Sequence, residues 1–99
     1  MARQMKVYGG VFDGTTRQIV ASPTKKVAAQ ALRVSLYYFN GYACETFNEV
    51  ELAVAMSEPG VVFSAPASSR DGAFVRGNVR YFRGSAWPPK GSILAEAAK

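Results

Sequence analysis

The segment from Ala28 to Tyr42 most constrains the fold, because its pattern is typical of two short helices joined by a tight turn. Ala29 is small where the helices would touch, and Ser35 is a suitable N-cap for the second helix. The residues expected to face inward are Ala28, Leu32, Val34, Phe39 and Tyr42. Such a helix-turn-helix-like corner often binds nucleic acid, and it is also an ordinary helical corner. Arg33 stands in the turn, where glycine is more usual because the position often needs positive φ.

An N-terminal β-hairpin is predicted before this corner. Two β-prone stretches, Lys6–Phe12 and Thr15–Ala21, flank the pair Asp13-Gly14, which favours a two-residue turn. Gly9 and Gly10 lie inside the first strand, where glycine indicates a bulge or a close approach by another backbone. Of the possible interpretations we favour a bend of this strand over the helices.

Capping signals predict the bounds of three helices. Ser22 caps a helix that begins at Pro23 and ends near Leu32, and the second helix covers 36–43. The stretch Thr46–Glu49 has the capping-box pattern and predicts a third helix over 47–57. Helical spacing places four of its side chains in the core, against Leu32, Phe39 and the hairpin. These four are Phe47, Val50, Ala53 and Val54.

The C-terminal third is predicted to hold a strand over 61–65, a hairpin over 73–82 that turns at Gly77-Asn78, and a frayed helix over 92–99. The fold class is therefore α+β: an N-terminal β-hairpin, three short helices with a helix-turn-helix-like corner, a short strand and a basic C-terminal hairpin or arm. Residues 1–99 form a single domain, with an α+β core over 1–65 and a basic aromatic arm and tail over 66–99.

Composition argues against catalysis. The chain of 99 residues has no histidine, the commonest general base and metal ligand, and one cysteine, Cys44. A single cysteine excludes an internal disulfide and a cysteine-based zinc site, so we expect Cys44 to be a buried structural thiol. We expect no catalytic residue, metal or cofactor. No apolar run approaches the ~20 residues that span a membrane, so we expect a cytoplasmic protein without a membrane partner.

Charge is uneven along the chain, whose net charge is +5. Residues 44–60 carry four glutamates and no lysine or arginine, whereas residues 70–90 carry four arginines and a lysine against Asp71. A basic arm beside an acidic helix suggests nucleic acid or an acidic protein as partner, and solubilising charge is the alternative.

The arm also concentrates tyrosine, tryptophan and arginine, the residue types enriched at protein-binding hot spots. These aromatics could instead be core or lid residues. Tyr37 and Tyr38 add two aromatics on the second predicted helix. We do not expect both of them to be buried at once. The predicted partner-binding residues are Arg76, Arg80, Tyr81, Arg83, Trp87, Tyr37 and Tyr38.

Nucleic-acid binding by the corner is the alternative. The second helix of such a corner offers its N-terminal residues to base edges, here Ser35 and Asn40. Lys25 and Lys26 lie on the outer side of the first helix and could hold phosphates. The second helix has no basic residue, which is poor chemistry for a specific major-groove reader.

Parts of the chain resemble a group of small uncharacterised proteins of bacteriophages and mobile elements. The resemblance is carried by Lys6–Gly10, Arg17–Ala21, Val34–Tyr42 and Glu45-Thr46. The likeness covers residues 5–63, and the group has glycine where this chain has Arg33 and Phe47. Small phage proteins often bind a host protein, including as inhibitors of CRISPR or other defence systems.

The resemblance implies a non-enzymatic, anti-CRISPR-like inhibitor in the host cytoplasm, a monomer or small homo-oligomer that binds a host protein or protein–nucleic-acid complex. The alternative function is a small helix-turn-helix DNA-binding regulator.

Overall fold

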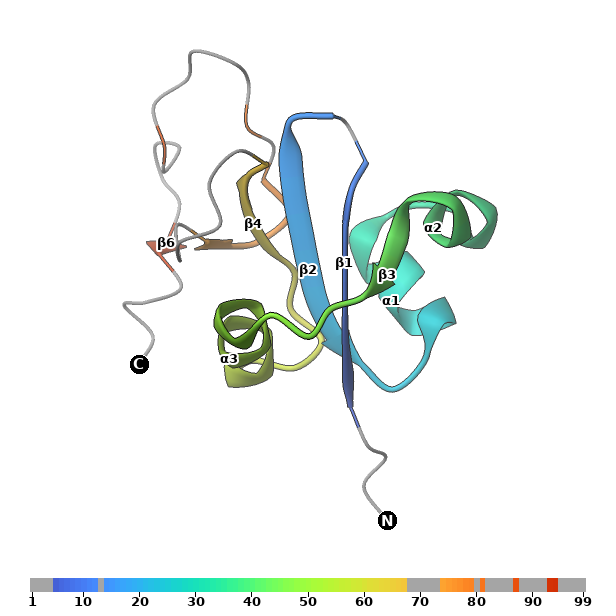
Figure 1. The fold of residues 1–99 in the computed structure, drawn as a ribbon, viewed down its shortest axis with the longest axis horizontal. Coiled ribbons are helices and arrows are strands. Elements are labelled where there is room, and N and C mark those ends of the chain that lie inside the picture. The colour runs from blue at the N-terminus through green and yellow to red at the C-terminus, as the bar shows by residue number, and fades with distance from the viewer. Residues whose placement is uncertain are drawn as a thin grey trace.

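A computed structural model describes residues 5–12, 14–67, 74–79, 81, 87 and 93–94. Its described part is α+β, with three helices and one antiparallel sheet in the strand order β3-β1-β2-β4-β5-β6 (Figure 1). The strands are β1 Lys6–Val11, β2 Thr16–Ser22, β3 Ala43–Glu45, β4 Phe63–Pro66, β5 Val75–Arg76 and β6 Ile93–Leu94. The predicted fold class and N-terminal hairpin are confirmed.

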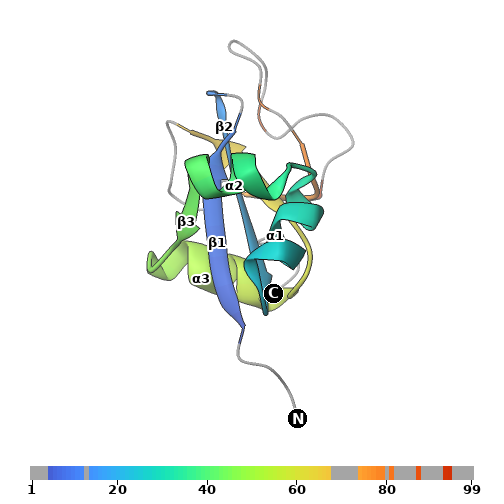
Figure 2. The same cartoon turned by 90° about the vertical axis from the view of Figure 1, so that its right-hand side faces the viewer.

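The helices lie on both faces of the sheet. Helices α1 (Lys25–Leu32) and α2 (Leu36–Tyr42) cover one face, and α3 (Glu49–Ser57) covers the other (Figures 1 and 2). Alternate strand residues point to opposite faces, so β1 and β2 supply both cores. One core cluster joins Val7, Ile19, Ala21, Phe63, Ala65 and Phe74 to Val54 and Ala55 of α3. The other joins Tyr8, Val20 and Val62 to Ala28, Ala29, Leu32 and Phe39.

The hairpin register differs from the predicted two-residue turn. Val11 pairs with Arg17, which centres the connection on Gly14, whose φ is +82°. A two-residue turn at Asp13-Gly14 would shift the register by one residue and turn every side chain of β2 to the opposite face. Arg17 would then point away from its partner Glu51 on α3. The predicted turn type is therefore wrong, and Asp13 itself lies outside the described residues.

The two glycines of β1 allow close packing. The ladder to β2 runs unbroken through Gly9 and Gly10, so neither forms a bulge, and the close approach by another backbone is confirmed at Gly10. The bend over the helices that we favoured stays a prediction. A Cβ atom at Gly10 would lie 2.7 Å from the carbonyl oxygen of Tyr42, and one at Gly9 would lie 2.9 Å from Nη2 of Arg17. Glycine is required at both positions because a side chain would displace these neighbours.

The caps of the first two helices follow local chemistry. Helix α1 begins at Lys25 with Thr24 as its N-cap, because Thr24 Oγ1 accepts from the amide of Val27 at 3.2 Å. The predicted cap Ser22 is wrong: its hydroxyl donates to the carbonyl of Thr24 at 2.6 Å. Arg33 adopts the left-handed conformation (φ 61°) that a turn there requires. Ser35 caps α2 as predicted.

Helix α3 begins two residues later than its predicted start. Asn48 is the N-cap, and its Oδ1 accepts from the amides of Val50 and Glu51 at 2.9 and 3.1 Å. The predicted capping box at Thr46–Glu49 is wrong, because the Thr46 hydroxyl donates to Glu51 Oε1 at 2.6 Å instead.

The later start of α3 changes which of its residues are buried. Phe47 is 76% exposed, Val50 and Ala53 are also exposed, and Val54 is buried as predicted. The predicted burial of the first three is wrong, because the ion-paired Glu51 occupies the inward position of the first turn.

The C-terminal strands pair differently from the prediction. β5 pairs with β4 and β6, whereas Val79 and Tyr81 lie outside any strand. Ile93–Leu94 is a strand where the sequence predicted a helix, and the rest of that segment lies outside the described residues. The predicted hairpin over 73–82 does not form because the buried Ser64 hydroxyl of β4 bonds to both sides of its turn. This hydroxyl donates to the carbonyl of Gly77 at 2.8 Å and accepts from the amide of Val79 at 3.1 Å. These bonds attach the segment to the sheet instead of to itself.

Candidate binding surface

Helix α2 leaves most of its surface in solvent. Phe39 is its one buried residue, while Tyr37 is 90% exposed and Leu36 and Tyr42 are exposed. The predicted inward position of Tyr42 is wrong, because its backbone carbonyl, and not its ring, packs against Gly10. An aromatic ring as exposed as that of Tyr37 contributes little to folding.

Tyr38 is held in place beside these exposed rings. Its hydroxyl donates to the carbonyl of Phe12 at 2.6 Å. The ring centroids of Phe12 and Tyr38 lie 5.8 Å apart, and those of Tyr38 and Tyr42 lie 4.6 Å apart. A hollow of about 580 Å³ lies over this helix. We call its lining residues the tyrosine face: Tyr37, Tyr38, Asn40, Gly41 and Tyr42. Fixed aromatic rings with polar tips are suited to docking on another macromolecule.

The predicted nucleic-acid residues lie on α1 and α2 and at the N-cap of α2. Asn40 is exposed within the tyrosine face, and Lys25 and Lys26 are exposed on α1. The Ser35 hydroxyl accepts from the amide of Tyr38 at 3.1 Å, so it serves the helix start. The two helices and their turn are present, and their use as a DNA-reading corner stays a prediction.

The structure separates the two predicted groups of partner-binding residues. Tyr37 and Tyr38 lie on α2, which packs over β1, whereas Arg76 lies on β5, at the other end of the sheet order. Arg76 is exposed and forms an ion pair with Glu58. Arg80 and Arg83 lie outside the described residues, so their role in binding stays a prediction.

Two of the three described aromatics of the predicted arm, Tyr81 and Trp87, contact each other. The Tyr81 and Trp87 rings meet edge to face with centroids 5.9 Å apart, and both residues are half-buried. The backbone amide of Tyr81 donates to Thr16 Oγ1 at 2.5 Å, and its carbonyl accepts from Thr15 Oγ1 at 2.7 Å. Tyr81 and Trp87 therefore stabilise this part of the chain on the sheet.

A buried ion pair crosses from the sheet to α3. Nη2 of Arg17 donates to Glu51 Oε1 at 2.9 Å, and Nε donates to Oε2. Glu51 is 1% exposed and also accepts from Thr46. The hydrogen bond to Glu51 raises the pKa of Arg17 above its ordinary value, while burial acts in the opposite direction. The sequence interpretation missed this pair, and its signal was an arginine inside an otherwise uncharged strand.

Cys44 is exposed, so its predicted burial is wrong. It lies on the edge strand β3 opposite Gly9, which has no side chain to cover it. Among the described residues no group of three or more Cys, Asp and Glu side chains is placed to hold a metal ion. In the same part of the chain, no helix combines the length and the apolar character needed to cross a membrane.

Comparison of the chain with protein-family models, curated proteins and solved structures finds no match. The functional proposal below therefore depends on the geometry of the tyrosine face and on the residues themselves.

Proposed function

We propose that this chain is a non-catalytic binding protein whose tyrosine face docks on a protein partner. The observation that carries this proposal is the exposure of Tyr37, 90%, beside a Tyr38 ring fixed by its bond to Phe12. Tyrosine loses little conformational entropy when it docks, and it is enriched at binding hot spots. A ring already fixed in the free protein lowers that cost further.

A protein partner fits this face better than a DNA duplex does. None of the side chains that line the hollow is charged, and α2 has no basic residue. Duplex binding depends chiefly on lysine and arginine contacts to phosphates. Lys25, Lys26 and Arg33 are exposed nearby and would complement an acidic partner surface.

The class of partner follows from the resemblance to phage proteins. On that basis the chain acts as a phage-type, anti-CRISPR-like inhibitor that binds a host nucleic-acid-handling defence complex. The absence of catalysis is part of the proposal. Its support is that the buried charged groups Arg17 and Glu51 are paired with each other.

Affinity capture from host lysate, with and without nuclease, tests the proposal. The bait is the full chain, either unchanged or with Tyr37→Ala, and Phe47→Ala is the matched control because it removes another highly exposed aromatic ring. We expect a protein partner that survives nuclease. Its affinity should fall by about 30-fold or more with Tyr37→Ala, the size of a hot-spot loss, and should be unchanged with Phe47→Ala. Equal loss with both variants, or capture that nuclease abolishes, would contradict the proposal.

The regulator function has one supporting observation, the exposure of Asn40 beside Lys25 and Lys26. It predicts sequence-specific duplex binding that Asn40→Ala relaxes and that weakens steeply with added salt. A gel-shift titration at two salt concentrations distinguishes it from the protein-binding proposal, which predicts no sequence-specific shift.

A further inference from the structure

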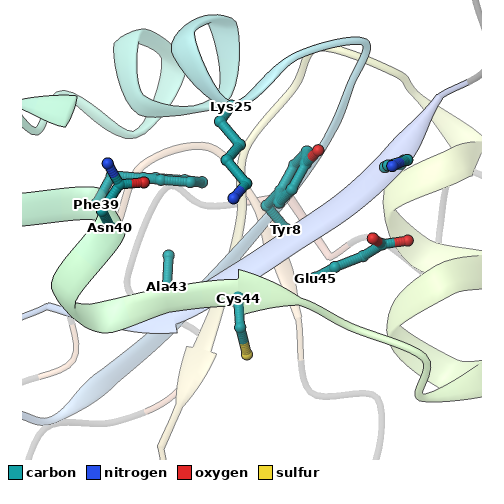
Figure 3. Close-up of a pocket in the computed structure, with 8 residues that line it drawn as sticks. Tyr8, Lys25, Phe39, Asn40, Ala43, Cys44 and Glu45 are labelled. Carbon is teal, nitrogen blue, oxygen red and sulfur yellow. The ribbon is translucent and has the colours of Figure 1, made fainter.

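A second hollow, distinct in chemistry from the tyrosine face, opens where α1, α2, β1 and β3 meet. This pocket has a volume of about 330 Å³ and shares only Asn40 with the tyrosine face. Its lining residues are Lys6, Tyr8, Lys25, Phe39, Asn40, Ala43, Cys44 and Glu45. Figure 3 shows Lys25 reaching down from α1, with its ammonium group between Phe39 and Tyr8, and Cys44 pointing away to the other side of β3.

The hydroxyl of Tyr8 is the unusual group in this pocket. Tyr8 is only 5% exposed, and its hydroxyl has no hydrogen-bond partner among the residues that the structure describes. No side-chain nitrogen or oxygen in that part of the chain is both fully buried and without a partner, so the Tyr8 hydroxyl oxygen is open to solvent although most of the residue is buried. A hydroxyl that is open to solvent and makes no bond within the described residues is free to donate to a bound ligand in exchange for its bond to water.

The charges around the pocket favour an anion. Lys6 and Lys25 line it, and neither forms an ion pair within the described residues. Lys25 is also the first residue of α1, whose first turn has no acidic side chain. A lysine at the positive end of the helix dipole is unfavourable by itself, and an anion bound beside it would offset both charges.

We propose that this pocket binds a small organic anion. Its carboxylate or phosphate group would lie between the ammonium groups of Lys6 and Lys25 and accept a hydrogen bond from the Tyr8 hydroxyl. The volume of the pocket, about 330 Å³, is near the lower limit for ligand sites and suits a body of about one ring. Glu45 at the rim disfavours ligands that carry further negative charges and can accept from a ligand hydroxyl. The site is tested on the isolated chain, because it shares Asn40 with the tyrosine face and Lys25 with the charges proposed above to complement an acidic partner.

Titration of the full chain with three probes tests this site: phenyl phosphate, benzoate and the uncharged benzyl alcohol. We expect saturable binding of phenyl phosphate, benzoate or both, seen as shifts in the amide resonances around Tyr8 and Lys25, and none of benzyl alcohol. The two anionic probes distinguish a phosphate site from a carboxylate site. Saturation below about 10 mM is the expected result, because it corresponds to a Kd in the millimolar range or better.

Variants identify the groups that bind. Lys25→Gln and Tyr8→Phe should each lower the affinity for the anion by about tenfold, because each removes a bond to a charged group. Lys26→Gln is the matched control, because it removes a neighbouring exposed charge that does not line the pocket. Three results would each overturn the proposal: no saturation by either anion, equal binding of benzyl alcohol, or equal weakening by Lys25→Gln and Lys26→Gln.

Discussion

The two faces of the sheet differ in whether the polar groups of their buried residues are bonded within the protein. On the α3 face, Glu51 is buried and its carboxylate accepts from both Arg17 and Thr46. On the α1–α2 face, Tyr8 is almost as buried a residue, but its hydroxyl is open to solvent and has no partner within the described residues, and Lys25 beside it forms no ion pair there. The comparison teaches that the burial of a residue alone does not separate structure from function: a polar group bonded within the protein holds the fold, and a polar group left open to solvent in a pocket is available to a ligand.

The energetics explain why the two cases differ in consequence. Removing one partner of a buried ion pair leaves an uncompensated charge, which is strongly destabilising. The Tyr8 hydroxyl is open to solvent and makes no bond to the described residues, so its removal leaves no buried group without a partner and should cost the fold little.

The largest effect is expected at the ion pair. Glu51→Ala should lower the free energy of unfolding by about 3–5 kcal/mol, because Arg17 is left charged and buried without its partner. Denaturant unfolding followed by circular dichroism measures the loss. Glu49→Ala, which changes an exposed glutamate in the same helical turn, is the control and should stay within about 0.5 kcal/mol. A similar small loss for Glu51→Ala would show that the α3 face does not depend on this pair.

Substitution of a glycine in β1 or α2 should change the stability of the fold by an intermediate amount. Gly10→Ala should destabilise by about 1–3 kcal/mol, because its Cβ would lie 2.7 Å from the Tyr42 carbonyl oxygen and 3.1 Å from the Ala43 Cα. Gly41→Ala is the matched variant: no atom lies within 4 Å of its Cβ, and alanine favours a helix, so stability should rise by about 0.5–1 kcal/mol. Thermal unfolding of both variants checks the packing of α2 on β1. A Gly10→Ala chain as stable as the parent would show that α2 does not lie against this strand.

Much of the fold follows from local sequence signals. The hairpin strands, three helices and the Ser35 cap were all predicted, because alternation, periodicity and capping chemistry act over a few residues. The start of α3 was not, since Thr46 and Asn48 are both good caps. The choice between them depends on Arg17, which lies 34 residues from Glu51 in sequence and orients the first turn of α3. The strand partners of β5 are similarly non-local.

The candidate sites were predicted less well. The sequence identified Tyr37 and Tyr38 as binding residues, because aromatic side chains crowd a helix too short to bury them all. It missed the ring contacts that Phe12 and Tyr42 make with Tyr38, and it missed the pocket around Tyr8. Whether a tyrosine hydroxyl finds a partner depends on the packing of three separate elements, and no local pattern encodes it.

The smallest expected effects come from a matched pair of tyrosines on the α1–α2 face. Tyr38→Phe removes the hydroxyl that donates to the Phe12 carbonyl, and it should cost about 1 kcal/mol. Tyr8→Phe removes a hydroxyl of a more deeply buried residue that makes no such bond to the described residues. The two variants therefore contrast a hydroxyl that bonds to the fold with one that makes no bond to the described residues.

The free energy of unfolding of Tyr8→Phe is the most direct test of the contrast between the two faces, measured in denaturant without added anions. The account predicts a value equal to that of the parent chain, within about 0.5 kcal/mol, or a higher one, because an unpartnered hydroxyl gives the fold nothing. A loss of about 1 kcal/mol or more, matching Tyr38→Phe, would contradict it. That result would show that the Tyr8 hydroxyl is bonded within the protein and that the pocket holds no unsatisfied group for a ligand.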